Sequence, residues 1–184
     1  MDKQKKKIFA ISGSTRVNSS NEALLKLLVK LYSDLVEIEI YSQLDKLPHF
    51  NPDVGDGHVS ETVKVLRSKI DQADGVLICT PEYVFSLPGA LKTALEWTVS
   101  TSVFTGKPFA FIVASGLGEK AYESLELIMN TILQYKIGDD AKLLIQGARA
   151  KLNSDGDVVD KNVRDDLRKL MDSLITQINN SSRL

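Results

Sequence analysis

Apolar residues recur along the chain with two different periods, and segments of the two kinds alternate. Short segments that are apolar throughout, or apolar at every second position, predict five strands at residues 7–12, 35–41, 75–80, 108–114 and 142–145. Longer segments with apolar residues three or four apart predict five amphipathic helices, at about 20–32, 60–72, 89–100 and 159–179, with another between the last two that ends near residue 135. Regular alternation of strands with helices predicts an α/β fold in which helices cover both faces of a parallel sheet.

The predicted strands differ in polarity, and the difference indicates where each one lies. Segments 75–80 and 108–114 are apolar throughout, as expected of central strands that are buried on both faces. Segment 35–41 alternates apolar residues with glutamates, which predicts a half-buried strand at an edge of the sheet. Among doubly wound sheets, the order 2-1-3-4-5 fits five strands with the second at an edge. We therefore expect one domain, residues 1–184, built as a three-layer sandwich.

Two unusual loops follow the first and the third predicted strands. In the order 2-1-3-4-5 the winding changes direction between these two strands, and ligands bind at such a point, beyond the carboxyl ends of the strands. The loops at residues 12–21 and 81–88 are therefore expected to face the same crevice.

The first of these loops is suited to a phosphate group. Residues 12–21 carry several hydroxyl side chains, one glycine and Arg16, and they lead into the N-terminus of a predicted helix. A helix N-terminus offers unpaired backbone N–H groups and the positive end of the helix dipole, and Arg16 adds a forked cation. An alternative interpretation is that Ser19, Ser20 and Asn21 merely cap the helix, with a glutamate as a favourable charge in its first turn. The loop has neither the Gly-Lys-Ser/Thr of the P-loop nor the three glycines of the dinucleotide fingerprint.

Composition and charge narrow the classes of partner. The 184 residues carry a formal net charge of −1, with 43% hydrophobic and 26% charged residues, which is ordinary for a soluble globular protein. A near-neutral chain without a long apolar segment predicts neither a nucleic acid nor a membrane as partner. The single cysteine, Cys79, excludes an internal disulfide, suits a reducing compartment and lies in a segment expected to be a buried, inert strand. We expect no signal peptide and a cytoplasmic protein, and no metal site, since His49 and His58 lack clustered ligands.

The sequences of both loops match the patterns of one known family. Residues 13–21 read Gly-Ser-Thr-Arg-Val-Asn-Ser-Ser-Asn, and residues 81–97 read Pro-Glu-Tyr-Val-Phe-Ser-Leu-Pro-Gly-Ala-Leu-Lys-Thr-Ala-Leu-Glu-Trp. These segments resemble the NADPH-dependent FMN reductases, whose patterns are Gly-Ser-Leu-Arg-x-x-Ser-x-Asn and Pro-Glu-Tyr-Asn-x-Ser-x-Pro-Gly-x-Leu-Lys-Asn-Ala-Leu-Asp-Trp. Residues 47–53 and 155–157 are similar to the family in a comparable way, so the resemblance extends over essentially the whole chain. It implies a flavodoxin-like fold.

The resemblance also implies which residues bind the cofactor FMN. It assigns the FMN phosphate to the first loop, and the flavin ring to the second loop and to a third loop at residues 115–118. It implies that one face of the ring stays open for a nicotinamide, and it assigns no acid–base side chain to catalysis. The cofactor-binding residues expected in this way are Ser14, Thr15, Arg16, Ser19, Ser20, Asn21, Pro81, Glu82, Tyr83, Val84, Ser115, Gly116 and Gly118. Val84 stands where the family pattern has asparagine.

The function implied by the resemblance is that of an FMN-dependent NAD(P)H oxidoreductase. Hydride would pass from NADPH or NADH to FMN, and two electrons would then pass to a small-molecule acceptor such as a quinone, an azo compound, chromate or a free flavin, in a ping-pong reaction. Members of the family are typically homodimers or homotetramers, so a homo-oligomer is expected. Two other classes stay open: a non-enzymatic electron carrier with the same fold, and a flavin-binding module that has lost activity.

Overall fold

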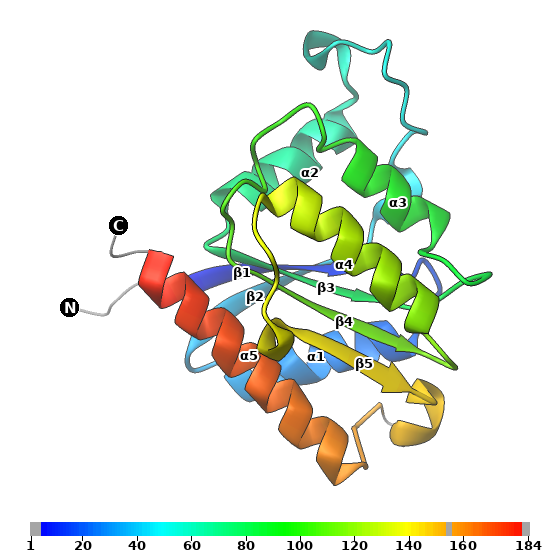
Figure 1. Cartoon of the computed structure of the whole chain (residues 1–184), viewed down its shortest axis with the longest axis vertical. Helices are drawn as coiled ribbons and strands as arrows, with labels where there is room; N and C mark the ends of the chain where they lie inside the picture. Colours follow the sequence, from blue (N-terminus) through cyan, green and yellow to red (C-terminus); the bar gives the residue numbers. More distant parts are fainter. Residues whose placement is uncertain (1–4, 154–155, 182–184) are drawn as a thin grey trace.

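The computed structural model describes residues 5–153 and 156–181. Its centre is a parallel sheet in the order β2-β1-β3-β4-β5, which confirms the predicted flavodoxin-like order (Figure 1). The strands are β1 (Lys6–Ser12), β2 (Val36–Tyr41), β3 (Gly75–Thr80), β4 (Phe109–Ser115) and β5 (Lys142–Gln146). Each strand begins and ends within one residue of its predicted bounds. Because every adjacent pair is parallel, the carboxyl ends of the strands lie at one edge of the sheet and the loops that follow them meet there.

Helices cover both faces of this sheet (Figure 1). On one face lie α1 (Ser20–Tyr32) and α5 (Lys161–Ser181), and on the other lie α2 (Glu61–Gln72), α3 (Gly89–Glu96) and α4 (Glu119–Leu133). These bounds agree with the predicted ones within two residues, except that α3 ends four residues early. Within the described ranges, no helix is both long and apolar enough to cross a lipid bilayer.

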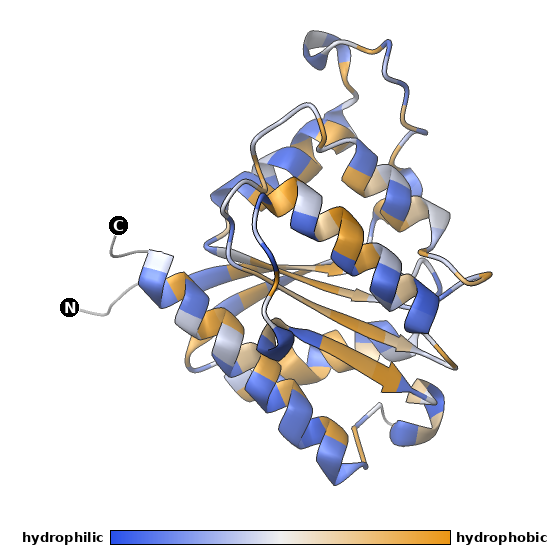
Figure 2. Cartoon of the chain, viewed as in Figure 1, coloured by the Kyte–Doolittle hydropathy of each residue, from blue (hydrophilic) through white to orange (hydrophobic). Residues whose placement is uncertain are grey.

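The core consists of buried apolar residues of the sheet and of the helices on its two faces. The strands are coloured mainly as hydrophobic in Figure 2, whereas the helices alternate between hydrophobic and hydrophilic residues. Every residue of β3 is buried, and so is every residue of β4 except the last. In β2 the glutamates are exposed and the alternate residues are buried or half-buried, which confirms the predicted edge strand. Full burial of a leucine, isoleucine or phenylalanine side chain contributes about 1.5–3 kcal/mol, so the central strands supply much of the stability of the fold.

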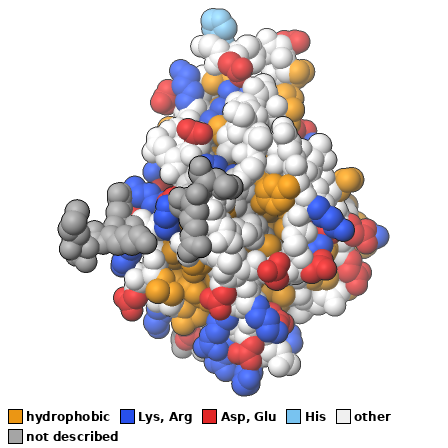
Figure 3. Space-filling model, turned by 60° about the vertical axis from the view of Figure 1, so that its left-hand side comes forward, with side chains coloured by type: hydrophobic (Ala, Val, Ile, Leu, Met, Phe, Trp, Pro, Cys, Tyr) orange, Lys and Arg blue, Asp and Glu red, His pale blue; other side chains and the backbone are white. Residues whose placement is uncertain are grey.

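Charged side chains of both signs are interspersed on the face shown in Figure 3. This arrangement agrees with the formal net charge of −1. Most of the charges that pair do so at the surface, as in the Lys161–Asp165 and Lys169–Asp166 ion pairs of α5. Exposed pairs of this kind contribute only about 0–1 kcal/mol each, so the apolar core and not surface charge holds the layers together.

Four of the five leucines of helix α1 are buried or half-buried, and the fifth is exposed. The apolar spacing predicts an inward stripe of Ala23, Leu24, Leu27, Leu28 and Leu31. Leu24 and Leu28 are buried and Leu27 is half-buried, as predicted, but Leu31 is 46% exposed and Leu25, outside the stripe, is fully buried. The hydroxyl of Tyr32 donates a hydrogen bond to Asp172 Oδ1 of α5 at 3.2 Å, which ties the end of α1 to α5. A helix rich in leucine offers more than one apolar stripe, and packing against α5 and the sheet selects between them.

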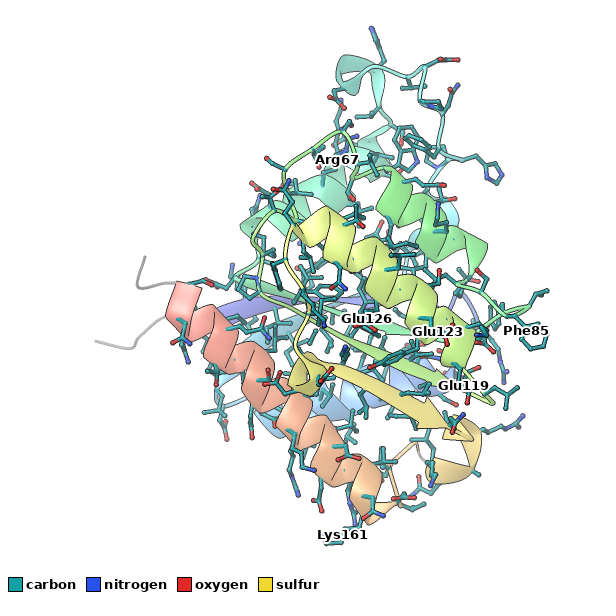
Figure 4. All side chains as sticks on the ribbon, viewed as in Figure 1. Arg67, Phe85, Glu119, Glu123, Glu126 and Lys161 are labelled. Carbon is teal, nitrogen blue, oxygen red and sulfur yellow. The ribbon has the colours of Figure 1, made fainter. Side chains whose placement is uncertain are left out.

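A cationic side chain of α2 ties the long loop between β2 and α2 to the end of α3. Arg67 (labelled in Figure 4) donates to Trp97 O at 2.8 Å, to Asp56 Oδ1 at 2.8 Å and to Ser100 Oγ at 3.0 Å. Trp97 in turn donates from its indole N–H to Pro48 O at 2.8 Å and is almost completely buried. Arg67 thus bonds the carbonyl of Trp97, the residue that follows the end of α3, and this end lies four residues before the one that the apolar spacing predicts.

Replacing Asp56 with asparagine should lower the thermal stability in a pH-dependent way. Hydrogen bonds from Arg67 and Ser100 hold the pKa of the Asp56 carboxyl below its usual value. A carboxylate whose pKa is lower in the folded state stabilises the protein above its unfolded pKa of about 4, and this contribution is lost as the pH falls through the folded pKa. Thermal unfolding of wild type and Asp56→Asn should therefore differ at pH 7 and converge toward pH 3. Asp53→Asn, in the same loop, is the control, and an equal deficit at both pH values would contradict the assignment.

Candidate functional site

The first loop leaves the sheet in close contact with the start of the second. Gly13 N–H donates to Cys79 O at 2.8 Å, and a Cβ atom on Gly13 would lie only 2.3 Å from Thr80 Oγ1. Only glycine fits this approach, because any side chain would displace the end of β3. A glycine at residue 13 is therefore required by the packing of the end of β1 against β3.

The loop ends at a helix N-terminus that is open to an anion. Ser19 is the N-cap of α1, and its Oγ accepts a hydrogen bond from Glu22 N at 3.1 Å, so the capping interpretation is correct as far as it goes. The backbone N–H groups of residues 17–21 nevertheless have no acceptor within the described part of the chain. Ser14 Oγ accepts from Arg16 N at 3.3 Å, and the exposed guanidinium of Arg16 has no partner among the described residues. Capping and anion binding are thus compatible at this helix end.

Asn21 occupies a different place from the hydroxyls of the loop. Its side chain is 3% exposed; its Nδ2 donates to Ala114 O at 3.2 Å, and its Oδ1 accepts from Cys79 Sγ at 3.3 Å. Asn21 therefore fastens the first turn of α1 to β3 and β4. Burial raises the pKa of the Cys79 thiol, which keeps it protonated as the donor in this link.

The second loop contains a tight hairpin that contacts the first loop. Tyr83 N donates to Ser86 O at 3.0 Å and Ser86 N donates to Tyr83 O at 3.1 Å, and the hydroxyl of Tyr83 lies 3.4 Å from Ser14 Oγ. The central residues Val84 and Phe85 both have positive φ, +52° and +56°, as a type I′ turn requires. Both are also strongly exposed, at 94% and 71%, and Figure 4 shows Phe85 projecting from the molecule.

Replacing Val84 with asparagine should stabilise the protein by about 1 kcal/mol. A β-branched residue with positive φ is strained, whereas asparagine adopts this conformation readily and is the residue of the family pattern at this position. For a chain of this length the gain corresponds to a rise in Tm of about 2–4 °C. Val84→Ala is the control, because it removes the exposed apolar side chain without favouring positive φ. Equal Tm values for the two variants would show that the turn is not strained.

The carboxylate of Glu82 joins the second loop to the third. Glu82 Oε2 accepts from Lys120 N at 2.9 Å and from Ala121 N at 3.0 Å, in the first turn of α4. The N-cap of that helix is Gly118, which has no side chain to do this, so Glu82 caps α4 from a distant part of the chain. Ser115 Oγ also donates a long hydrogen bond, of 3.5 Å, to the backbone oxygen of Glu82. The N-terminus of α4 is therefore already neutralised by an anionic side chain, whereas that of α1 is open.

The third loop is shaped by two glycines. Gly116 O accepts from Gly147 N at 3.1 Å, which joins the loop to the segment after β5. Gly118 is buried with φ of +99°, and a Cβ there would lie 2.8 Å from Leu144 Cδ1. Gly118 thus serves the turn into α4 and faces β5.

The loops enclose a cavity of about 1110 Å³ at the carboxyl edge of the sheet. Most of the expected cofactor-binding residues line it, namely Ser14, Arg16, Ser19, Ser20, Asn21, Pro81, Tyr83, Ser115 and Gly116. Thr15, Glu82, Val84 and Gly118 do not line it. The cavity also extends to one side of α1 and to residues 147–150, 152–153 and 156–157, which sequence reasoning missed. The sequence did contain a signal for this segment. Gly147 comes directly after β5, so the segment begins at the same edge of the sheet as the other loops.

Comparison with known proteins agrees with the resemblance seen in the loops. The family model described as NADPH-dependent FMN reductase matches residues 6–148. The chain is 32% identical to NADH-dependent flavin reductase subunit 2 of Lactobacillus johnsonii, over 86% of this chain and 85% of that one. It is 30% identical to a 2-hydroxy-1,4-benzoquinone reductase of a Burkholderia species, over 90% and 92% of the two chains. Among solved structures, FerB of Paracoccus denitrificans, a flavoenzyme NAD(P)H:(acceptor) oxidoreductase, is similar with a TM-score of 0.74 and 25% identity, over 95% and 98% of the chains.

Proposed function

The chain belongs to the NADPH-dependent FMN reductase family, and from this membership we propose that it binds FMN in the cavity and reduces a small-molecule acceptor. The donor is NADPH or NADH, and the acceptor is a quinone, an azo compound, chromate or a free flavin. One observation carries the proposal: the open N-terminus of α1 and the Tyr83 hairpin border a single cavity and touch at Ser14 and Tyr83, 3.4 Å apart.

The donors of the first loop fit a phosphate monoester. The backbone N–H groups of residues 17–21, the hydroxyls of Ser14 and Ser19 and the guanidinium of Arg16 are available to its oxygens. We assign the phosphate to Ser14, Arg16, Ser19, Ser20 and Asn21, which line the cavity, with Asn21 acting through its backbone. Thr15, which is also expected at the phosphate, does not line the cavity. The buried positions of Ser14 and Ser19 support the assignment, since their hydroxyls are held in place around the loop.

The second and third loops fit a flat heterocycle. We assign the ring to Pro81, Tyr83, Ser115 and Gly116, which line the cavity. Of the other residues expected at the ring, Glu82 joins the second loop to the third, and Val84 and Gly118 do not line the cavity. When bound, FMN supplies the chemistry, which is to accept hydride and to pass on two electrons. The chain supplies binding and orientation, and no acid–base side chain is assigned to the reaction.

Spectroscopy and steady-state kinetics test this function. Purified protein loaded with FMN should show flavin absorbance that bleaches when NADPH is added anaerobically and returns when a quinone is added. Because donor and acceptor use the same open side of the cavity in turn, initial rates at several quinone concentrations should give parallel double-reciprocal lines. Protein that binds FMN but is not bleached by NADPH or NADH would instead be a carrier or a binding module.

We also propose that the active form is a homodimer or a homotetramer. The exposed apolar side chains of Val84 and Phe85, beside the cavity, support association because contact with a second copy would remove them from water. Sedimentation-velocity ultracentrifugation tests this, and a monomer at micromolar concentration would contradict it.

A further inference from the structure

One residue of β3 holds both ends of the first loop. Where the loop begins, Gly13 N–H donates to Cys79 O at 2.8 Å. Where it ends, Cys79 Sγ donates to Asn21 Oδ1 at 3.3 Å. No other donor reaches Asn21 Oδ1 within residues 5–153 and 156–181. The backbone and the thiol of Cys79 therefore fix the two ends of the loop relative to one strand.

The side chain of Asn21 also connects the first loop with the starting points of the other two. Its Nδ2 donates to Ala114 O at 3.2 Å, and Ala114 directly precedes the third loop. Cys79 lies at the end of β3, just before the second loop. Asn21, Cys79 and Ala114 are at most 3% exposed, so these bonds are shielded from water. An amide that uses both its oxygen and its nitrogen on fixed, buried partners has a single orientation.

This orientation bears on the N–H groups at the end of the first loop. Asn21 belongs to the first turn of α1, and the N–H groups of residues 17–21 have no acceptor within the described part of the chain. Such groups bind an anion well only when they point at one position, and a supporting layer of side chains has to hold them there. Cys79 does not line the cavity, so its thiol can act on these groups only through Asn21.

We infer that Cys79 is a positioning residue for the anion site. Through its bond to Asn21, the thiol holds the first turn of α1 where the open N–H groups converge on the phosphate of FMN. The inference rests on the proposed function, which places the phosphate there. The thiol takes part only as a hydrogen-bond donor, and burial, which raises its pKa, keeps the proton in place. This role is compatible with the inert, buried cysteine that the sequence predicts.

Titrations of FMN and of riboflavin into three variants test this role. Cys79→Ala removes the donor and leaves Asn21 Oδ1 unpaired, so the affinity for FMN should fall about tenfold, whereas the affinity for riboflavin, which lacks the phosphate, should stay within about twofold. Cys79→Ser keeps a donor and should bind FMN within about threefold of wild type. The control is Val76→Ala, in the same strand and equally buried but without a side-chain hydrogen bond. It should lower the Tm at least as much as Cys79→Ala and leave both affinities unchanged.

A double-mutant cycle shows whether the thiol acts through Asn21. Asn21→Ala should weaken FMN binding at least as much as Cys79→Ala, and the double variant should bind FMN no more weakly than Asn21→Ala. Effects that add in the double variant would refute the inference, and so would equal losses for FMN and riboflavin or equal affinities of Cys79→Ala and Cys79→Ser for FMN. If the Asn21 variants do not fold, the comparison of Cys79→Ala with Cys79→Ser decides. Failure of wild type to bind FMN would refute the proposed function itself, whereas the other outcomes leave it standing.

Discussion

Replacing Ser19 with aspartate should abolish FMN binding while leaving helix α1 intact. Aspartate is as good an N-cap as serine, so it should keep the hydrogen bond from Glu22 N that Ser19 Oγ now accepts. Its carboxylate, however, would stand among the unpaired N–H groups of residues 17–21, where we place the phosphate. Loss of a hydroxyl donor together with repulsion between two anions costs about 3–5 kcal/mol, which is at least a hundredfold in Kd.

The same substitution at another helix gives a matched control. Ser60 is the N-cap of α2, accepts a hydrogen bond from Val63 N at 3.4 Å and does not line the cavity. Ser60→Asp should leave both the Tm and the affinity for FMN unchanged. Riboflavin, which has no phosphate, should bind wild type and Ser19→Asp equally. If Ser19→Asp bound FMN as tightly as wild type does, the loop would be a cap and nothing more.

Replacing Glu82 with alanine should destabilise the fold and loosen the cavity at the same time. The change leaves the N–H groups of Lys120 and Ala121 without the carboxylate that now caps α4. Loss of a cap and of the favourable charge at a helix N-terminus costs about 1–3 kcal/mol, which lowers the Tm by several degrees. Because the second loop would no longer be held to the third, the affinity for FMN should fall about tenfold.

A variant at the neighbouring Glu119 separates the contribution of the helix cap to stability from the contribution of a negative charge. Glu119, in the same first turn of α4, accepts from Gln146 Nε2 at 3.0 Å and does not cap the helix (Figure 4). Glu119→Ala removes the same charge and should change the stability by no more than about 0.5 kcal/mol. Thermal unfolding and FMN titration of both variants make the comparison. Equal Tm values for Glu82→Ala and Glu119→Ala would show that the bond from Glu82 to α4 contributes nothing.

The elements and their order in the sheet could be predicted because their signals are local. The exposed glutamates of β2 report burial on one face, and the unbroken apolar sequence of β3 reports burial on both. Strand order then follows from the rules of doubly wound sheets, which leave few arrangements for five strands with an edge strand in second place. The meeting of the first two loops at one edge follows from that order.

Other features of the candidate site depend on partners that are distant in the chain. Glu82 caps a helix that begins 37 residues later, and Asn21 binds the carbonyl of Ala114 across 93 residues. In both cases the motif identifies an important residue, but its partner is a backbone group, which has no signature in the sequence. The last turn of α1 is a similar case, because spacing alone places Leu31 inward, whereas the structure exposes Leu31 and buries Tyr32, which bonds to Asp172 of α5.

By itself, the sequence determined the family, the alternation of strands and helices, and the two loops that border the cavity. These properties depend on residue types at short spacing, and short spacing is visible along a chain. Only the tertiary structure decided that Glu82 caps α4, that Asn21 faces the interior, and that the cavity continues beside α1 to Arg149. Each of these depends on which backbone groups and side chains are brought together when the sheet forms, and that is settled by packing over the whole domain.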